Sequence, residues 1–154
     1  MAPSVTAQGI RLLSQLGNTL LLPEQAGLIS LNATCNLNAN SVYSNFKKGN
    51  QGANYQVPAG KKFRALLWQL STDSSGNSAT FGGATAAAIA ESTITAPTGL
   101  IIQKKAVSFS GAALPTNYDI LDDFVAATFL IALGTQATGT GIIYHTLIGI
   151  ELAA

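Results

Sequence analysis

Charged side chains are scarce in this chain of 154 residues. Asp, Glu, Lys and Arg together make up 10% of it, against roughly a quarter in typical soluble domains. A chain with so few charges exposes mainly small and uncharged polar residues, or covers much of its surface with neighbouring molecules. The formal net charge is +1, so no broad basic field is available to hold nucleic acid, and we expect no nucleic-acid partner.

Cysteine and histidine occur once each. With Cys35 alone, no disulfide can form within the chain, and its place in an alternating apolar run predicts a small core residue. His145 is accompanied by no G-x-S-x-G nucleophile motif, so we interpret it as a structural or interface residue. We therefore expect the protein not to be an enzyme.

Metal and cofactor motifs are also missing. A metal site needs clustered ligands, and the nearest cluster is Asp119, Asp122 and Asp123, which could hold a hard cation. Its spacing matches no known loop, which favours a solvated acidic turn. The glycines of residues 134–141 lack the Lys-Ser/Thr ending of a phosphate loop and predict a hairpin loop instead. No cofactor is expected.

Long hydrophobic runs are absent. The longest, residues 124–133, is about half the length that a membrane helix needs. The N-terminal residues lack a basic segment before their apolar ones, and Arg11 and Gln15 interrupt them, so they do not predict a signal peptide. We expect synthesis in the cytoplasm and no membrane partner.

From residue 28 onward the dominant pattern is that of β-strands. Apolar and polar residues alternate, and the Pro58-Ala59-Gly60 turn precedes one of the strands. The Ala-rich residues 84–90 predict at most one or two helical turns. The expected strands are residues 29–37, 42–43, 61–70, 100–109, 124–133 and 142–152. This pattern predicts an all-β sandwich or barrel with little helix.

The run at residues 124–133 is apolar on both faces, and such a strand must be covered on both. A chain of this length has one core to offer, so we expect a second copy of the protein to cover the other face. The predicted oligomer interface consists of Phe124, Phe129, Ile131 and Leu133.

Residues 1–26 differ from the rest and are expected to form an N-terminal arm before a β domain over residues 27–154. Leucine and isoleucine recur in the arm at helical spacing, at Ile10, Leu13, Leu16 and Leu20. Gly9 and Gly17 weaken a helix, and an extended arm is the alternative.

Most of the basic residues occur as paired lysines, at 47–48, 61–62 and 104–105. They are either solvated edge charges or contacts to an acidic protein surface. Trp68 with Tyr43 and Tyr55 could form a sugar-stacking platform. Because Trp68 is expected to share its face with Leu66 and Leu70, core packing is favoured.

The element Tyr55-Gln-Val-Pro-Ala-Gly-Lys61, followed by a strand, resembles one that recurs in small jelly-roll proteins of bacteriophage particles. The ending DDFVAATFLIALGTQATGTGIIYHTLIGIEL looks like their final two strands. Over residues 55–152 the chain is similar to phage capsid cement (decoration) proteins, including those of tailed cyanophages. The resemblance implies an antiparallel jelly-roll sandwich and a homotrimer at local three-fold positions of the outer capsid, clamping neighbouring major capsid subunits.

The expected function is therefore that of a structural virion protein on the outer capsid surface. The alternative is a receptor- or carbohydrate-binding module of a phage tail or fibre. Such a module displays exposed aromatic side chains at a loop end, whereas the aromatic residues here fall mainly within expected strands. The expected contacts with the major capsid protein are Ile10, Leu13, Leu16, Leu20, Lys47, Lys48, Lys61, Lys104 and Lys105.

Overall fold

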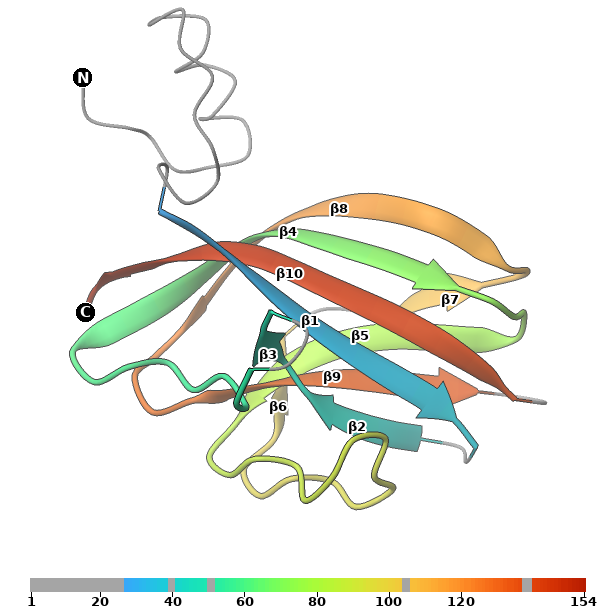
Figure 1. Ribbon diagram of the computed structural model, residues 1–154, viewed down its shortest axis with the longest axis horizontal. Helices are drawn as coiled ribbons and strands as arrows, with labels where there is room; N and C mark the ends of the chain where they lie inside the picture. Colours follow the sequence, from blue (N-terminus) through green and yellow to red (C-terminus); the bar gives the residue numbers. More distant parts are fainter. Residues whose placement is uncertain (1–26, 39–40, 50–51, 104–105, 137–139) are drawn as a thin grey trace, which may run out of the picture.

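A computed structural model describes residues 27–38, 41–49, 52–103, 106–136 and 140–154. Within these ranges the chain forms two antiparallel β-sheets and no helix (Figure 1). The all-β sandwich expected from the sequence is confirmed. The helical turns expected over residues 84–90 do not form. The expected arm, residues 1–26, lies outside the described residues.

The first sheet has the strand order β3-β1-β10-β4-β8, and the second has the order β2-β9-β5-β6, with β7 also paired to β5. The strands of the first sheet are β3 (Lys47–Lys48), β1 (Leu28–Leu37), β10 (Gly141–Ala153), β4 (Lys61–Thr72) and β8 (Ala113–Phe124). Those of the second are β2 (Ser41–Asn45), β9 (Phe129–Gln136), β5 (Asn77–Ala84), β6 (Ile101–Ile102) and β7 (Val107–Phe109).

The core lies between the two sheets and is centred on aromatic side chains. Trp68 on β4 is fully buried and makes an edge-to-face contact with Phe81 on β5, with ring centroids 5.0 Å apart. Trp68 therefore packs in the core, as the favoured interpretation predicted, and offers no stacking platform to a sugar. Cys35 is also buried, which raises the pKa of its thiol to about 12 and keeps it protonated and unreactive.

A β-bulge in β4 changes which of its side chains face the core. Simple alternation places Phe63 and Ala65 on the face opposite Trp68, yet all three are buried. The pairing of β4 with both of its neighbours shifts register around Leu66. The extra residue lets both halves of the strand turn their apolar side chains inward.

Opposite the bulge, Gly149 on β10 is needed for close approach of the two strands. A Cβ atom at this position would collide with the backbone carbonyl oxygen of Arg64. Replacing Gly149 with Ala is therefore expected to lower the free energy of unfolding by about 1–3 kcal/mol, measured by chemical denaturation. Gly111 provides the control, because a Cβ there meets nothing within 4 Å. Equal stabilities of the two alanine variants would contradict this account of the bulge.

The prediction of one continuous strand over residues 124–133 was wrong. β8 ends at Phe124, the chain turns through Ala127 with a φ of 62°, and β9 begins at Phe129 in the other sheet. The run is apolar throughout because Phe124 belongs to one sheet and residues 129–133 to the other. Apolar content alone did not reveal the turn between them.

The outer face of β9 is covered by the chain itself. Residues 85–100, here called the covering segment, pass over this face, and Ala88 packs with Ile131 (Figure 1). The Asn45 side chain fixes the segment in place: its Nδ2 donates to the Ala88 carbonyl at 3.0 Å, and its Oδ1 accepts from the Ala88 amide at 2.9 Å. Thr93 and Tyr43 also exchange two backbone hydrogen bonds.

This covering segment corrects the reasoning behind the predicted oligomer interface. Ile131 and Phe124 are 0% and 2% exposed within the single chain, so neither is available to a second copy. Phe129 and Leu133 are half-buried. The two-sided apolarity of β9 is satisfied by the core on one face and by the covering segment on the other.

Candidate functional site

His145, the only histidine of the chain, is enclosed in the core. It is 1% exposed, and its Nδ1 accepts a hydrogen bond from Trp68 Nε1–H at 3.3 Å. Burial lowers the pKa of this imidazole to about 3, so it is neutral at pH 7 and carries its proton on Nε2. Nε2 has no hydrogen-bond partner among the described residues. This position suits a structural residue.

Glu151, the acid that a Ser–His–acid arrangement on this strand would need, is engaged elsewhere. Its Oε1 accepts a hydrogen bond from the Tyr55 hydroxyl at 2.9 Å. This bond joins the end of β10 to the segment that leads into β4. Glu151 and His145 therefore serve separate structural contacts.

The acidic residues expected to form a turn lie within β8 instead. Asp123 accepts two hydrogen bonds from Arg64, at 2.7 and 2.8 Å, and lies 3.5 Å from Lys62 Nζ. The hydrogen bonds from Arg64 hold the pKa of Asp123 below its usual value. Among the residues that the structure describes, no group of three or more His, Cys, Asp or Glu side chains could hold a metal ion.

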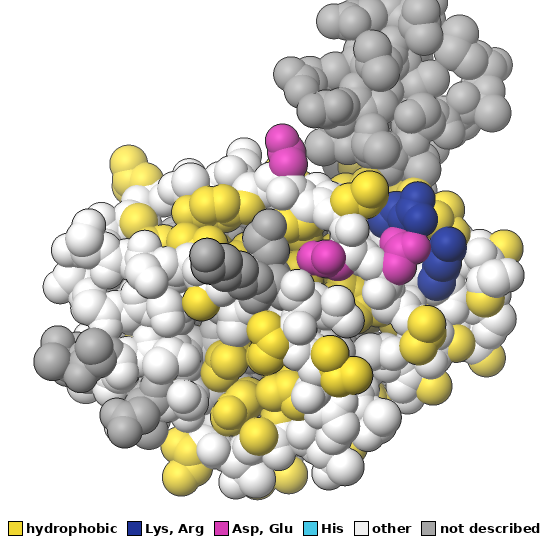
Figure 2. Space-filling model, turned by 180° about the vertical axis from the view of Figure 1, so that it is seen from behind, with side chains coloured by type: hydrophobic (Ala, Val, Ile, Leu, Met, Phe, Trp, Pro, Cys, Tyr) yellow, Lys and Arg dark blue, Asp and Glu magenta, His cyan; other side chains and the backbone are white. Residues whose placement is uncertain are grey.

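The lysines predicted to contact a capsid occupy different surroundings. Lys47 forms an ion pair with Glu91 of the covering segment, at 2.6 Å, whereas Lys48 and Lys61 are exposed on the surface. Lys104, Lys105 and the predicted arm contacts Ile10, Leu13, Leu16 and Leu20 fall outside the described residues. Figure 2 shows one broad face on which Lys and Arg side chains gather at one end, with hydrophobic side chains spread over the remainder.

The two large apolar side chains with the highest exposure on any described strand belong to β8. Leu114 and Leu121 are 86% and 71% exposed, and we call them together the β8 surface. Because β8 is the last strand of its sheet, its outer edge has no β partner within the described residues. Sequence reasoning missed this surface because the strands expected over residues 100–109 and 124–133 leave most of β8 outside any strand. Two more exposed apolar residues, Ile89 and Ile94, lie on the covering segment and are 79% and 68% exposed.

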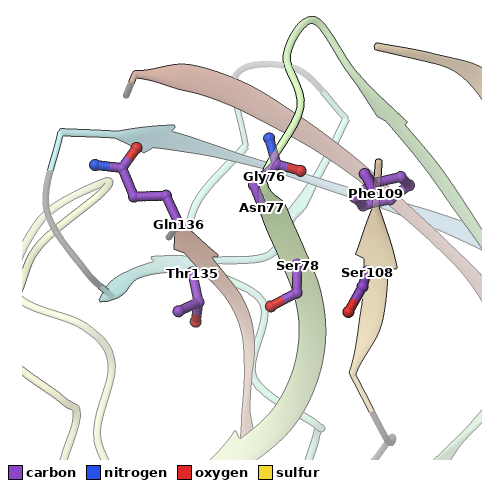
Figure 3. A pocket seen from close by; sticks show the side chains of 7 residues that line it. All are labelled: Gly76, Asn77, Ser78, Ser108, Phe109, Thr135 and Gln136. Carbon is purple, nitrogen blue, oxygen red and sulfur yellow. The ribbon is translucent and has the colours of Figure 1, made fainter. Parts of the chain in front are cut away.

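One end of the second sheet holds a shallow hollow of about 320 Å³ (Figure 3). The strand register places the hydroxyl residues Thr135, Ser78 and Ser108 side by side across β9, β5 and β7. Phe109 also lines the hollow but is 8% exposed. None of the residues that line the hollow is charged, and most of them carry a hydroxyl or an amide group.

A second hollow of about 240 Å³ lies where β8 ends, and we call it the Val125 groove. Its lining includes Gly83, Ile101, Gln103, Phe124, Val125 and Thr128. Val125 and Ile101 are 72% and 65% exposed. The groove therefore presents apolar side chains to solvent.

The described residues include no helix that is long and apolar enough to cross a membrane. No family model, curated protein or solved structure matches this chain.

Proposed function

We propose that the protein is a structural virion protein, a homotrimeric cement protein that binds the outer capsid surface and stabilises contacts between major capsid subunits. The observation that carries this proposal is the β8 surface, where two leucines are 86% and 71% exposed on an unpaired strand edge. An open strand edge can pair with another chain, and an exposed leucine gains free energy when a partner covers it. The resemblance of residues 55–152 to phage cement proteins supports the same function.

The subunit contact is assigned to the β8 surface in place of the outer face of β9, which the covering segment occupies. Each leucine that becomes fully buried in an assembly contributes roughly 1.5–3 kcal/mol. A cement protein needs a second surface for the capsid, and Ile89 and Ile94 supply one on the covering segment. Exposed Lys48 and Lys61 remain available for acidic capsid groups.

The oligomeric state of the protein is the first test of this proposal. The full chain is expected to be a trimer at micromolar concentration in light scattering, and Leu121→Glu is expected to dissociate it. Since Leu121 is exposed within the chain, its variant should keep the circular dichroism spectrum of the parent. Ser30→Glu, at an exposed position of β1 in the same sheet, is the control and should remain trimeric. A monomeric parent protein would contradict the trimer.

The copy number and position of the protein in purified virions are the second test. Purified virions are expected to carry the protein at a copy number comparable to that of the major capsid protein. A few copies confined to the tail would instead favour the receptor-binding alternative. Absence from intact virions would reject both.

A carbohydrate-binding module is the second candidate, because the hollow of Figure 3 presents the hydroxyls of Ser78, Ser108 and Thr135 in one row. Sugars are bound by such uncharged hydrogen-bonding groups, usually beside an exposed aromatic ring. Phe109 is buried and offers no such ring. Glycan binding that is lost in Ser108→Val would favour this candidate over the cement function.

A further inference from the structure

The Val125 groove is open, apolar and small. Its volume of about 240 Å³ falls below the range of roughly 300–1,000 Å³ that is common for small-molecule sites. A groove of this size suits a few aliphatic side chains better than a ligand molecule. Val125 and Ile101 line it and remain largely exposed, so an apolar segment that bound there would remove them from water.

The chain enters the described fold at the end of the molecule that carries this groove. Leu28 of β1, Ile150 of β10, Arg64 of β4 and Asp123 of β8 lie in one row across the first sheet. Neighbouring strands are about 4.8 Å apart, so β1 and β8 are separated in this row by about 15 Å. Figure 1 places the start of β1 and the turn between β8 and β9 at the same end of the molecule.

The backbone at Gly27 turns the chain before β1 begins. Gly27 has a φ of +73°, in the left-handed region that favours glycine. At Gly27 the backbone therefore departs from the extended line of β1. Leu22 is six positions before Leu28, and six residues span at most about 20 Å. The run Leu20-Leu21-Leu22 can therefore reach the groove of its own chain.

We propose that the Leu20-Leu21-Leu22 run of the same chain binds in the Val125 groove. The run supplies three consecutive aliphatic side chains, and the groove exposes the apolar side chains that they would cover. Docking at this point ties the base of the N-terminal arm to the end of β8 and leaves residues 1–19 to contact a partner. This inference goes beyond the proposed function, because it holds whether or not the protein sits on a capsid.

Disulfide trapping in the full-length chain tests the proposal. Leu21→Cys is combined with Val125→Cys and oxidised with glutathione disulfide, while the buried Cys35 thiol stays unreactive. We expect an intramolecular disulfide, seen as a faster-migrating monomer on a non-reducing gel. This disulfide should form on the order of tenfold faster than one from Leu21→Cys to either of two control positions, Ala153→Cys or Leu114→Cys. Docking raises the effective concentration of the two thiols.

The controls separate docking from simple tethering. Ala153 is exposed at the same end of the molecule, and Leu114 is exposed at the far end of β8. If Leu21→Cys reacts as fast with Ala153→Cys as with Val125→Cys, the run is tethered but not docked, and the proposal is rejected. Disulfide-linked dimers or trimers would also reject it, since a neighbouring copy would then fill the groove. Ile101→Cys provides a second trapping position should the Val125 variant misfold.

Discussion

Replacing Ile131 with Glu is expected to unfold the protein rather than to dissociate an oligomer. Ile131 is 0% exposed, enclosed between β9 and the covering segment with Ala84 and Ala88. A carboxylate at this position would be buried without a partner or would expel the covering segment. The expected loss is more than about 4 kcal/mol, which is a large part of the roughly 5–15 kcal/mol that stabilises a typical domain.

Circular dichroism and thermal denaturation measure this loss, with two variants for comparison. Ile131→Val removes one methyl group and should cost about 0.5–1.5 kcal/mol. Leu121→Glu places the same charge at an exposed residue, so it should dissociate the trimer but leave each subunit folded. A folded Ile131→Glu monomer with the melting temperature of the Leu121 variant would show that the covering segment does not protect β9 in solution.

Acid is expected to destabilise the protein from about pH 6.5 downward, because the folded core holds His145 in its neutral form. The pKa of His145 is about 3 in the folded protein, against an ordinary value of 6.5. The unfolded chain therefore binds a proton at a pH where the folded chain does not. His145 contributes its full stabilisation above pH 6.5, and this is lost as the pH falls toward 3. The free energy of unfolding should fall by up to about 1.4 kcal/mol for each pH unit in this window.

The His145→Gln variant isolates this effect. A glutamine carbonyl can accept the hydrogen bond from Trp68 Nε1–H, and it does not titrate. Between pH 6.5 and 4.5 the parent should lose roughly 2–3 kcal/mol more than the variant, measured by urea denaturation. Protonation of Asp123 affects stability only at lower pH, because the pKa of its carboxyl lies below the usual value of 3.8. Parallel stability curves for the two proteins would contradict a neutral buried histidine.

The strand class could be predicted because simple alternation holds from Leu31 to Leu37 in β1 and from Ile143 to Gly149 in β10. Cys35 and His145 follow this alternation and both are buried. The Ala-rich stretch failed as a helix because tertiary contacts override propensity. Ala88 is held by both hydrogen-bonding groups of the Asn45 amide, from a residue 43 positions away. No local pattern contains that contact.

The candidate surfaces were harder to predict than the fold. The β8 surface depends on which strand ends a sheet, and strand order is set by pairings between distant segments. The bulge at Leu66 and the turn at Ala127 each alter which side chains face inward, although neither changes the apolar pattern. The prediction that Ile131 lies in an oligomer interface was wrong for a related reason. The residues that cover Ile131 precede it by more than thirty positions in the chain.

The pairing of β1 with β10 also governs the order in which the molecule can be completed. The side chains of Asn32 and Thr146, which hydrogen-bond across these strands, are 114 residues apart in the chain. β10 lies between β1 and β4 in the first sheet, so those two strands stay separate until β10 has left the ribosome. Such distant pairing slows folding and leaves apolar strands uncovered meanwhile. The nascent chain therefore depends on β10 to close the core, and aggregation during synthesis is the hazard that this topology carries.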